Sequence, residues 1–163
     1  MKNTILTAIV IVLALMTACT KPDRSDETAV LSQEIVNGGL SDFEHAVERV
    51  DSAEQAGLFT AVYANTTKAI IYENADQQRL AAYYAEKAIA AEEGMVVTTS
   101  TDSSLYCTPR WILADCLYTD GEYGKSIALS KEILAFVGDG TSAKEVTMKC
   151  RALLQIAECE SEL

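Results

Sequence analysis

Apolar side chains recur every three to four residues along almost all of the chain after residue 28. This spacing places them on one face of an α-helix, whereas a half-buried strand requires an alternation that no useful stretch of this chain shows. The pattern therefore predicts an all-α domain. The expected helices are a weak one near residues 28–37 and stronger ones near 42–55, 58–74, 77–92, 104–119, 122–137 and 142–161.

Short polar breaks at residues 74–76 and 120–122 divide these helices into pairs. Breaks of this length predict that the flanking helices pack antiparallel, as hairpins. The residues expected to pack in the first hairpin are Ala69, Tyr72, Leu80, Ala81, Tyr84, Ala85, Ala88 and Ile89. In the second, the apolar face of Trp111, Leu113, Ala114 and Leu117 is expected to meet a helix that carries Tyr123, Ser126, Ile127, Ile133 and Leu134.

Two capping boxes are expected to mark helix starts. In each, a serine hydroxyl accepts a hydrogen bond from the amide three residues later, and a glutamate at that position bonds back to the serine amide. The pairs are Ser41 with Glu44 and Ser142 with Glu145. The segment from Met95 to Ser103 is rich in hydroxyl side chains and is predicted to be a surface loop.

The hairpin pattern repeats along the chain. Three segments of the form aromatic or Gln, then two residues, then a small residue, begin at Phe43, Gln78 and Tyr123, at spacings of 35 and 45 residues. The segment Cys107–Cys116 is echoed by Cys150–Cys159 after 43 residues, with Leu-Ala-Asp in one matching Ile-Ala-Glu in the other. These echoes predict a stack of similar helix pairs.

The chain resembles the tetratricopeptide repeat family, whose helix pairs carry small residues in mid-helix, a glycine turn and a Tyr-x-x-Ala start to the second helix. The resemblance implies antiparallel hairpins stacked as a short right-handed superhelix, with roughly 34 residues per repeat, so the longer spacings here are a departure. It also implies protein or peptide binding. The residues that carry the repeat packing are Ala69, Tyr72, Ala81, Ala88, Leu113, Ala114, Leu117, Gly121, Tyr123 and Ser126.

The last segment reads as the first helix of a pair without its partner. Either it is a terminal helix that caps the array, with Glu158, Glu160 and Glu162 on its solvent-exposed face, or the chain is a shortened relative of a longer protein. The leader, the acidic helical array and the run Tyr83–Ala88 together resemble the extracytoplasmic sensor region of the helical-repeat histidine kinases of Bacteroides-type bacteria. That resemblance implies signalling through a partner.

The first 18 residues have the features of a signal peptide. Lys2 is followed by the apolar run Ile5–Leu15 and then by two small residues before Cys19. A membrane-spanning helix needs about 20 apolar residues, more than this run supplies. The stretch ending at Cys19 resembles a bacterial lipobox, with Met16 in place of the usual leucine, which implies lipid attachment at Cys19. The alternatives are an ordinary secretory leader and a short uncleaved anchor.

We expect a lipid-anchored protein of the cell envelope, on the periplasmic or outer-membrane face, with residues 19–28 as a polar tether and residues 29–163 as the helical-repeat domain. Removal of Lys2 with the leader changes the net charge from -11 to -12. Such a charge disfavours nucleic acid, whose phosphates need Lys and Arg, and also direct adhesion of the folded domain to anionic lipid. Most of the acidic residues are expected to be solvated helix faces.

The four cysteines of the helical domain are expected to act as buried apolar residues. Because positions nine apart on a helix point to opposite sides, neither Cys107 with Cys116 nor Cys150 with Cys159 can bond. A disulfide between Cys107 and Cys150, or between Cys116 and Cys159, stays open as an alternative in an oxidising compartment.

Nothing in the sequence indicates catalysis. His45 is the single histidine, so a His-based triad and a two-histidine metal site within one chain are excluded. We therefore expect no enzyme activity and neither metal nor cofactor. Trp111 and the tyrosines are expected mainly to pack between helices, although they are also suited to line a ligand groove. The sequence favours a protein-binding or peptide-binding module, with a lipoprotein that binds a small molecule or glycan as the alternative.

Overall fold

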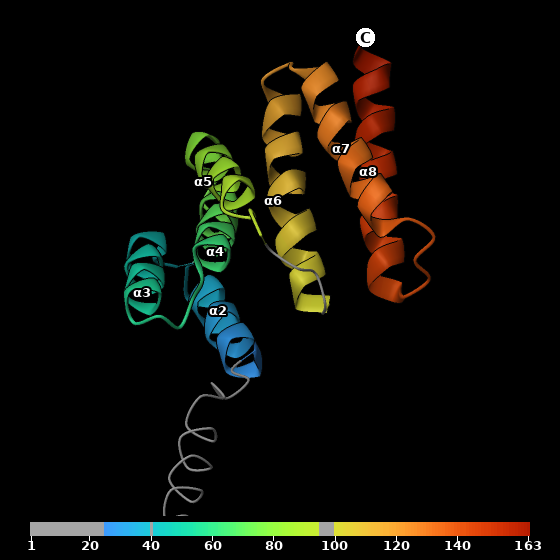
Figure 1. Ribbon diagram of the computed structural model, residues 1–163. Helices are drawn as coiled ribbons and strands as arrows, with labels where there is room; N and C mark the ends of the chain where they lie inside the picture. Colours follow the sequence, from blue (N-terminus) through green and yellow to red (C-terminus); the bar gives the residue numbers. More distant parts are fainter. Residues whose placement is uncertain (1–24, 40, 95–99) are drawn as a thin grey trace, which may run out of the picture.

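The computed structural model describes residues 25–39, 41–94 and 100–163, and within these ranges it contains helices and no strands. Figure 1 shows them as a stack of helix pairs, which confirms the all-α class. The helices are α2 (Ser25–Gly39), α3 (Phe43–Gln55), α4 (Ala61–Asn74), α5 (Gln78–Ala90), α6 (Ser100–Thr119), α7 (Tyr123–Val137) and α8 (Ala143–Glu162).

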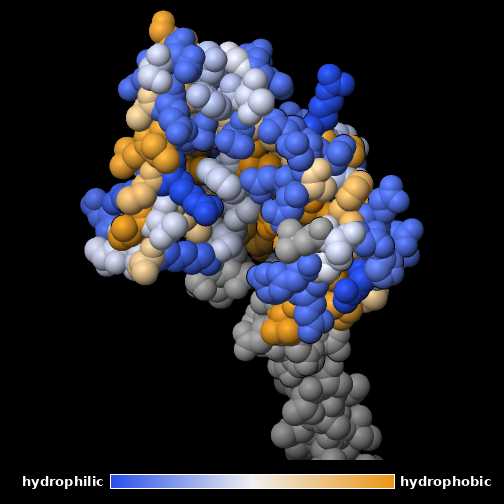
Figure 2. All heavy atoms as spheres, turned by 180° about the vertical axis from the view of Figure 1, so that it is seen from behind, coloured by the Kyte–Doolittle hydropathy of each residue, from blue (hydrophilic) through white to orange (hydrophobic). Residues whose placement is uncertain are grey.

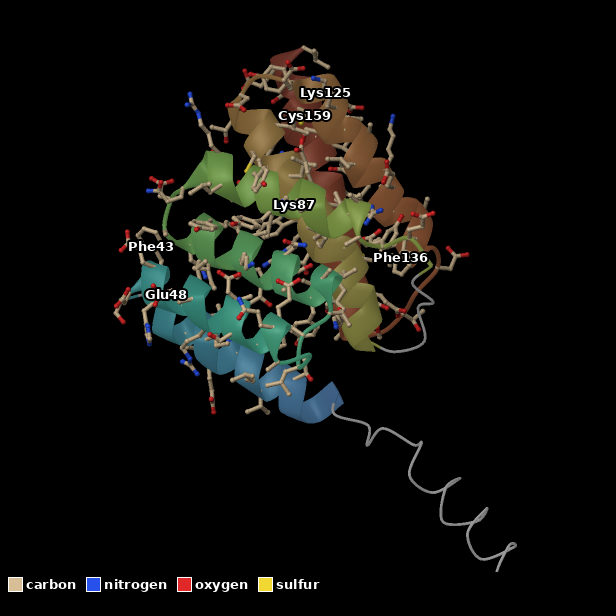
Figure 3. The ribbon with its side chains drawn as sticks, turned by 60° about the vertical axis from the view of Figure 1, so that its left-hand side comes forward. Phe43, Glu48, Lys87, Lys125, Phe136 and Cys159 are labelled. Carbon is tan, nitrogen blue, oxygen red and sulfur yellow. The ribbon has the colours of Figure 1, made fainter. Side chains whose placement is uncertain are left out.

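Consecutive helices pack against each other from α2 to α8. In addition, α4 contacts α2, and α6 contacts both α4 and α8. The helices α2, α4, α6 and α8 therefore form one continuous layer, and α3, α5 and α7 each pack against two neighbouring helices of that layer. Figure 3 shows this stack from the side, with Phe43 of α3 and Phe136 of α7 on opposite flanks.

The core is divided into three clusters along the stack. The first surrounds Ile35, Val50 and Ile71, and the third joins Ile133 of α7 to Ala152 of α8. The central cluster consists largely of small residues on α4, α5 and α6, with Ile112 as its main bulky side chain. Small residues permit close approach of the helix backbones, so the middle of the stack is tightly packed.

The structure places the predicted repeat-packing residues mainly between helices. Five of them have no exposed surface: Ala69, Ala81, Ala88, Ala114 and Ser126. Tyr72, Leu113, Leu117 and Tyr123 are half-buried. The Ser126 hydroxyl donates to the Ala114 carbonyl at 2.8 Å, which ties α7 to α6. Gly121 has a φ of +75°, a conformation that side chains with a Cβ rarely adopt, and it makes the turn between these helices.

One of the two predicted capping boxes is correct. At α8 the Ser142 hydroxyl and the Glu145 carboxylate form the reciprocal pair. At α3 the prediction is wrong, because the cap is Asp42, whose carboxylate accepts from the His45 amide at 3.0 Å. Ser41 instead donates to the Gly38 carbonyl at 3.0 Å, so it satisfies the end of the preceding helix.

Three predicted boundaries differ from the structure. Helix α6 begins at Ser100, inside the predicted loop 95–103, and residues 95–99 lie outside the described residues. Ser, Thr and Asp are favoured in the first turn of a helix, so a polar run is compatible with a helix start. Helix α2 begins at Ser25, inside the predicted tether 19–28. Helix α4 begins at Ala61 because the Thr60 hydroxyl caps it.

Cys107, Cys116, Cys150 and Cys159 are free thiols, so neither open disulfide is formed. Three of them are buried, as predicted, but Cys150 is exposed. It lies on the side of α8 opposite the buried Cys159, as a separation of nine residues requires. Cys19 and the leader lie outside the described residues. No helix in the described part of the chain is both long and apolar enough to span a membrane.

Candidate functional site

The layer formed by α2, α4, α6 and α8 carries two adjacent pockets. The first, the α8 pocket, has a volume of about 410 Å³ and is lined by α4, α6 and α8, with Ile133 of α7. The second, the α2 pocket, has a volume of about 420 Å³ and lies between α2, α4 and α6. Both are lined by Ile70, Thr108 and Lys144, so they join into one groove. Figure 2 shows a hollow between the two halves of the molecule, with hydrophobic side chains at its floor.

The α8 pocket combines an apolar floor with charged groups. Trp111, Ile133 and Met148 supply apolar surface. The Arg151 guanidinium lies 4.5 Å from the centre of the Trp111 ring, a cation–π contact that holds a positive charge over the pocket. In a chain with a net charge of -11, this concentration of Arg151 and Lys144 is a local exception.

Glu73 also lines the α8 pocket, and the pKa of its carboxyl is raised to near neutral pH. Burial raises its pKa to about 7, repulsion from Asp115 adds to the increase, and Arg151 opposes it. Burial likewise raises the pKa of the Cys107 thiol to about 11. A thiol with such a pKa remains protonated at neutral pH, so Cys107 is an apolar wall of the pocket and not a nucleophile.

Replacing Glu73 by glutamine is expected to make stability less dependent on pH. The pKa of an unperturbed glutamate carboxyl is 4.5, and that of Glu73 in the folded protein is about 7. The folded state therefore retains the proton, and the wild type loses about 1–2 kcal/mol as the pH rises from 4.5 through 7, a value reduced from the full shift for partial solvation. Glutamine does not titrate, so Glu73→Gln gains stability relative to the wild type over this range.

Urea unfolding of both proteins at about pH 4.5, 6 and 8 measures this difference. The exposed Glu86→Gln on α5 is the matched control and should show the same difference from wild type at each pH. A stability difference between Glu73→Gln and the wild type that does not change with pH would contradict the raised pKa of Glu73.

The α2 pocket is lined by hydroxyl groups, of which some are hydrogen-bonded within the protein and one is not. Thr67 donates its hydroxyl to the Tyr63 carbonyl at 2.8 Å, and its oxygen lies 3.1 Å from the Ser32 hydroxyl. Thr66 is only 4% exposed, and its hydroxyl has no hydrogen-bond partner, the one such buried side-chain atom found within the described residues. Leaving a buried hydroxyl unpaired costs roughly 1–3 kcal/mol. Thr66 is therefore an unsatisfied hydroxyl in the wall of this pocket, with its oxygen shielded from solvent in the free protein.

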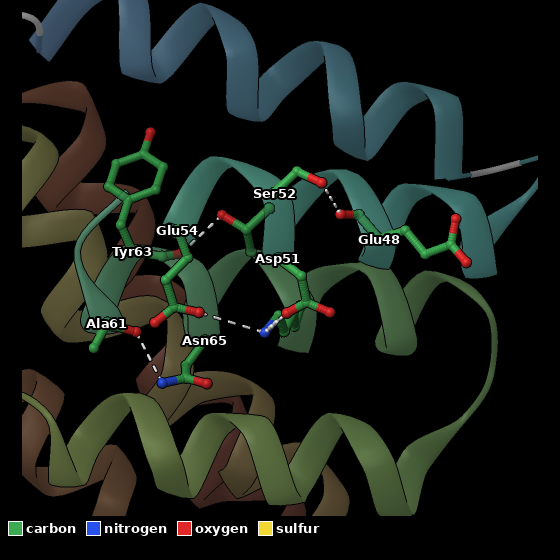
Figure 4. A network of polar contacts seen from close by, with 9 residues as sticks. Glu48, Asp51, Ser52, Glu54, Ala61, Tyr63 and Asn65 are labelled. Atoms are coloured by element: carbon green, nitrogen blue, oxygen red, sulfur yellow. Dashed lines mark hydrogen bonds and ion pairs between the residues drawn. The ribbon is translucent and has the colours of Figure 1, made fainter. Parts of the chain in front are cut away.

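Two buried cations outside the groove are structural. Lys68 is 6% exposed and its ammonium lies 2.5 Å from Asp51 and 3.6 Å from Glu54, which ties α4 to α3 (Figure 4). Arg110 is also 6% exposed and binds Glu92 at 2.7 Å and Glu132 at 3.0 Å. Each positive charge is compensated by two carboxylates, so neither residue is available for a ligand.

Aromatic residues divide between packing and the groove. Trp111 and Tyr63 line the pockets. Tyr72 stacks on Tyr84 with ring centres 5.4 Å apart, and Tyr106 stacks on Phe136 at 4.0 Å. Most of the tyrosines thus serve packing, as the sequence indicated.

Sequence reasoning missed the polar residues of the groove. Thr66, Ile70 and Glu73 follow each other at spacings of four and three, so they share one face of α4. The sequence signal that could have pointed to Thr66 and Glu73 was their position on the same helix face as the apolar Ile70. Nothing comparable marked Arg151, since its role depends on contact with Trp111 from another helix.

Comparison with family models, with curated proteins and with solved structures finds no match. The residues that the structure describes contain no group of three or more His, Cys, Asp or Glu side chains placed to hold a metal ion.

Proposed function

We propose that this protein is a membrane-tethered helical-repeat module of tetratricopeptide type that binds an extended peptide segment of a partner protein along its groove. The supporting observation is the continuity of the two pockets through Ile70, Thr108 and Lys144. A continuous groove across four helices suits an extended chain, and signalling through the bound partner is the role that the resemblance to sensor regions favours.

The two pockets suit different parts of a peptide. The apolar floor of the α8 pocket is suited to an apolar side chain, with Arg151 and Lys144 favouring a nearby acidic group. The α2 pocket offers hydroxyl groups to the peptide backbone, whose amides and carbonyls require partners once they are desolvated. The unpaired Thr66 hydroxyl gains most from such a contact, which requires a small displacement of the pocket wall because the oxygen is shielded in the free protein.

Replacing Thr66 by valine is expected to weaken peptide binding without destabilising the protein. Valine matches threonine in shape, and the lost hydroxyl has no partner in the free protein. Affinity for a peptide selected from a random library against the full chain should fall about fivefold, the effect of one hydrogen bond of about 1 kcal/mol. Fluorescence anisotropy in nonionic detergent measures the affinity.

Thr67→Val is the matched control, since it removes a hydroxyl that is already bonded to Tyr63 and Ser32. It should lower the free energy of unfolding by about 1 kcal/mol, whereas Thr66→Val should leave it unchanged or raise it. Trp111→Ala should also weaken binding, while Tyr83→Ala, at an exposed position of α5, should not. Peptides whose affinity responds to Tyr83→Ala but to neither groove variant would contradict the proposal.

A small molecule or glycan is the second candidate ligand. The hydroxyl lining of the α2 pocket favours it, because Ser32, Thr66 and Thr67 lie together beside Tyr63. Stabilisation of the full chain by oligosaccharides, with no peptide selected from the library, would favour this alternative.

We further propose that the protein is anchored in the cell envelope through lipid on Cys19, on the strength of the lipobox-like leader. Replacing Cys19 by serine is expected to move the protein out of the detergent phase when cells are extracted with a phase-separating detergent. Two or more acyl chains give stable anchoring, and serine cannot receive the thioether-linked lipid. The buried Cys159→Ser is the control. Unchanged partition of Cys19→Ser would contradict the anchor.

A further inference from the structure

Helix α8 exposes a line of apolar residues on the side that faces away from the rest of the stack. Val146 is 45% exposed, Leu153 55% and Leu154 59%. Cys150 and Ala157, which are also exposed, complete the line. We call these five residues the α8 stripe. Figure 1 places α8 at the outer end of the stack, and Figure 2 shows hydrophobic side chains along that side.

The spacing of the α8 stripe is that of a helix-packing face. Its members follow one another at intervals of four, three, one and three residues, which keeps them on one side of a helix. The opposite side of α8 carries Ala152, Gln155 and Cys159, which are buried in the stack. Helix α8 is therefore apolar on two sides, and the residues that the structure describes cover only one of them. A contiguous exposed apolar surface of this kind marks an interaction site.

Charges beside the α8 stripe indicate what covers it. Lys149 and Glu160 are 11 residues apart, so they lie on the same edge of the stripe and about 16 Å from each other along the helix. They are too distant to pair within one helix. An antiparallel second α8 brings the same edges together, so that Lys149 of each copy faces Glu160 of the other. In a parallel two-fold pair these edges instead lie on opposite sides of the interface, so Lys149 and Glu160 of the two copies do not meet.

The register follows from the two leucines at the middle of the stripe. A two-fold axis between Leu153 and Leu154 packs the leucines of the two copies against each other and places Cys150 opposite Ala157. These smaller residues permit close approach of the two helices. In this register Lys149 and the Glu160 of the second copy differ by only about 3 Å along the helix axis.

We propose that the α8 stripe is the interface of a symmetric homodimer, in which two copies of α8 pack antiparallel. One helix from each copy makes a small interface, so the expected dissociation constant is on the order of micromolar. The groove opens on another side of α8, where Arg151 contacts Trp111, so the dimer is independent of the proposed peptide binding.

Cross-linking through Cys150 tests this interface in the full chain. In the proposed dimer the two Cys150 residues are offset by roughly 10 Å along the helices, within reach of a flexible bis-maleimide. The protein in nonionic detergent should give a cross-linked dimer whose yield rises with protein concentration and disappears in Cys150→Ser. Leu153→Glu should weaken association more than about tenfold, because it places a charge in the apolar centre.

Charge exchange tests the antiparallel register. Lys149→Glu and Glu160→Lys should each weaken association about fivefold, because each replaces two attractive contacts by two repulsive ones. The double variant Lys149→Glu/Glu160→Lys should restore it to within about twofold of the wild type. Leu80→Glu, at an exposed leucine of α5, should have no effect. Monomers at all concentrations, unchanged dimer in Leu153→Glu, or failure of the double variant to recover would each overturn the proposal.

Discussion

Replacing Arg110 by methionine is expected to lower the free energy of unfolding by about 3 kcal/mol, since removing one partner of a buried ion pair leaves the other uncompensated. The guanidinium binds Glu92 and Glu132, donates to the Tyr106 carbonyl at 2.9 Å, and lies 3.6 Å from the centre of the Tyr106 ring. The Glu92 side chain is only 11% exposed, so its charge has little access to water once Arg110 is lost. Urea unfolding of the full chain, followed by far-ultraviolet circular dichroism, measures the change.

Lys125→Met is the matched control for Arg110→Met. Lys125 also pairs with a carboxylate, at 3.2 Å from Glu122, but both side chains are more than half exposed. Exposed pairs contribute little, so this variant should change stability by less than about 0.5 kcal/mol. Equal losses in the two variants would show that burial of the Arg110 cluster is not what makes it important.

Replacing Ile112 by alanine is expected to cost about 3 kcal/mol, within the range for deleting a large aliphatic side chain from a core. Ile112 is 1% exposed and packs against Ala69, Ala81 and Ala85. These neighbours are too small to fill the space that the deletion leaves, so a cavity is expected to persist. Urea unfolding again provides the measurement.

Two further variants should show that the loss of stability grows with the amount of buried side chain removed. Ile112→Val removes a single methylene and should cost about 1 kcal/mol, while Leu80→Ala at a 41% exposed position should cost less than that. If Ile112→Ala behaves like Leu80→Ala, the central cluster is not closed around Ile112 in solution.

The helices were predictable because each one carries its own signal. Their apolar positions recur with the helical period, and the glycine in the polar break 120–122 predicts the turn between α6 and α7, where Gly121 has a positive φ. The Ser142 capping box was predictable because all its members lie within four residues. The Ser41 prediction failed, although the motif was present, because the neighbouring Asp42 supplies a better cap and Ser41 bonds backward to Gly38.

The groove depended on contacts between distant segments. In the sequence Thr66 is indistinguishable from any other helical threonine, and only the packing of α2 and α6 encloses it. Arg151 is likewise indistinguishable from a surface arginine, and only the fold brings it against Trp111. The pKa of Glu73 likewise depends on its burial and on Asp115 of another helix. The sequence shows only that Thr66 and Glu73 share a face of α4. Their environments, and the contact of Arg151 with Trp111, arise where chain segments far apart in the sequence meet.

The sequence by itself determined the all-α class, the order of the helices and the small residues between them, because helical periodicity and turn chemistry act over a few neighbouring residues. Only the tertiary structure decided which face of the layer became a groove, that Thr66 has no partner there, that Cys150 points outward, and that α8 is apolar on its uncovered side. These features arise where helices from different parts of the chain meet, and the free energy of burial or of an ion pair exists only once they do.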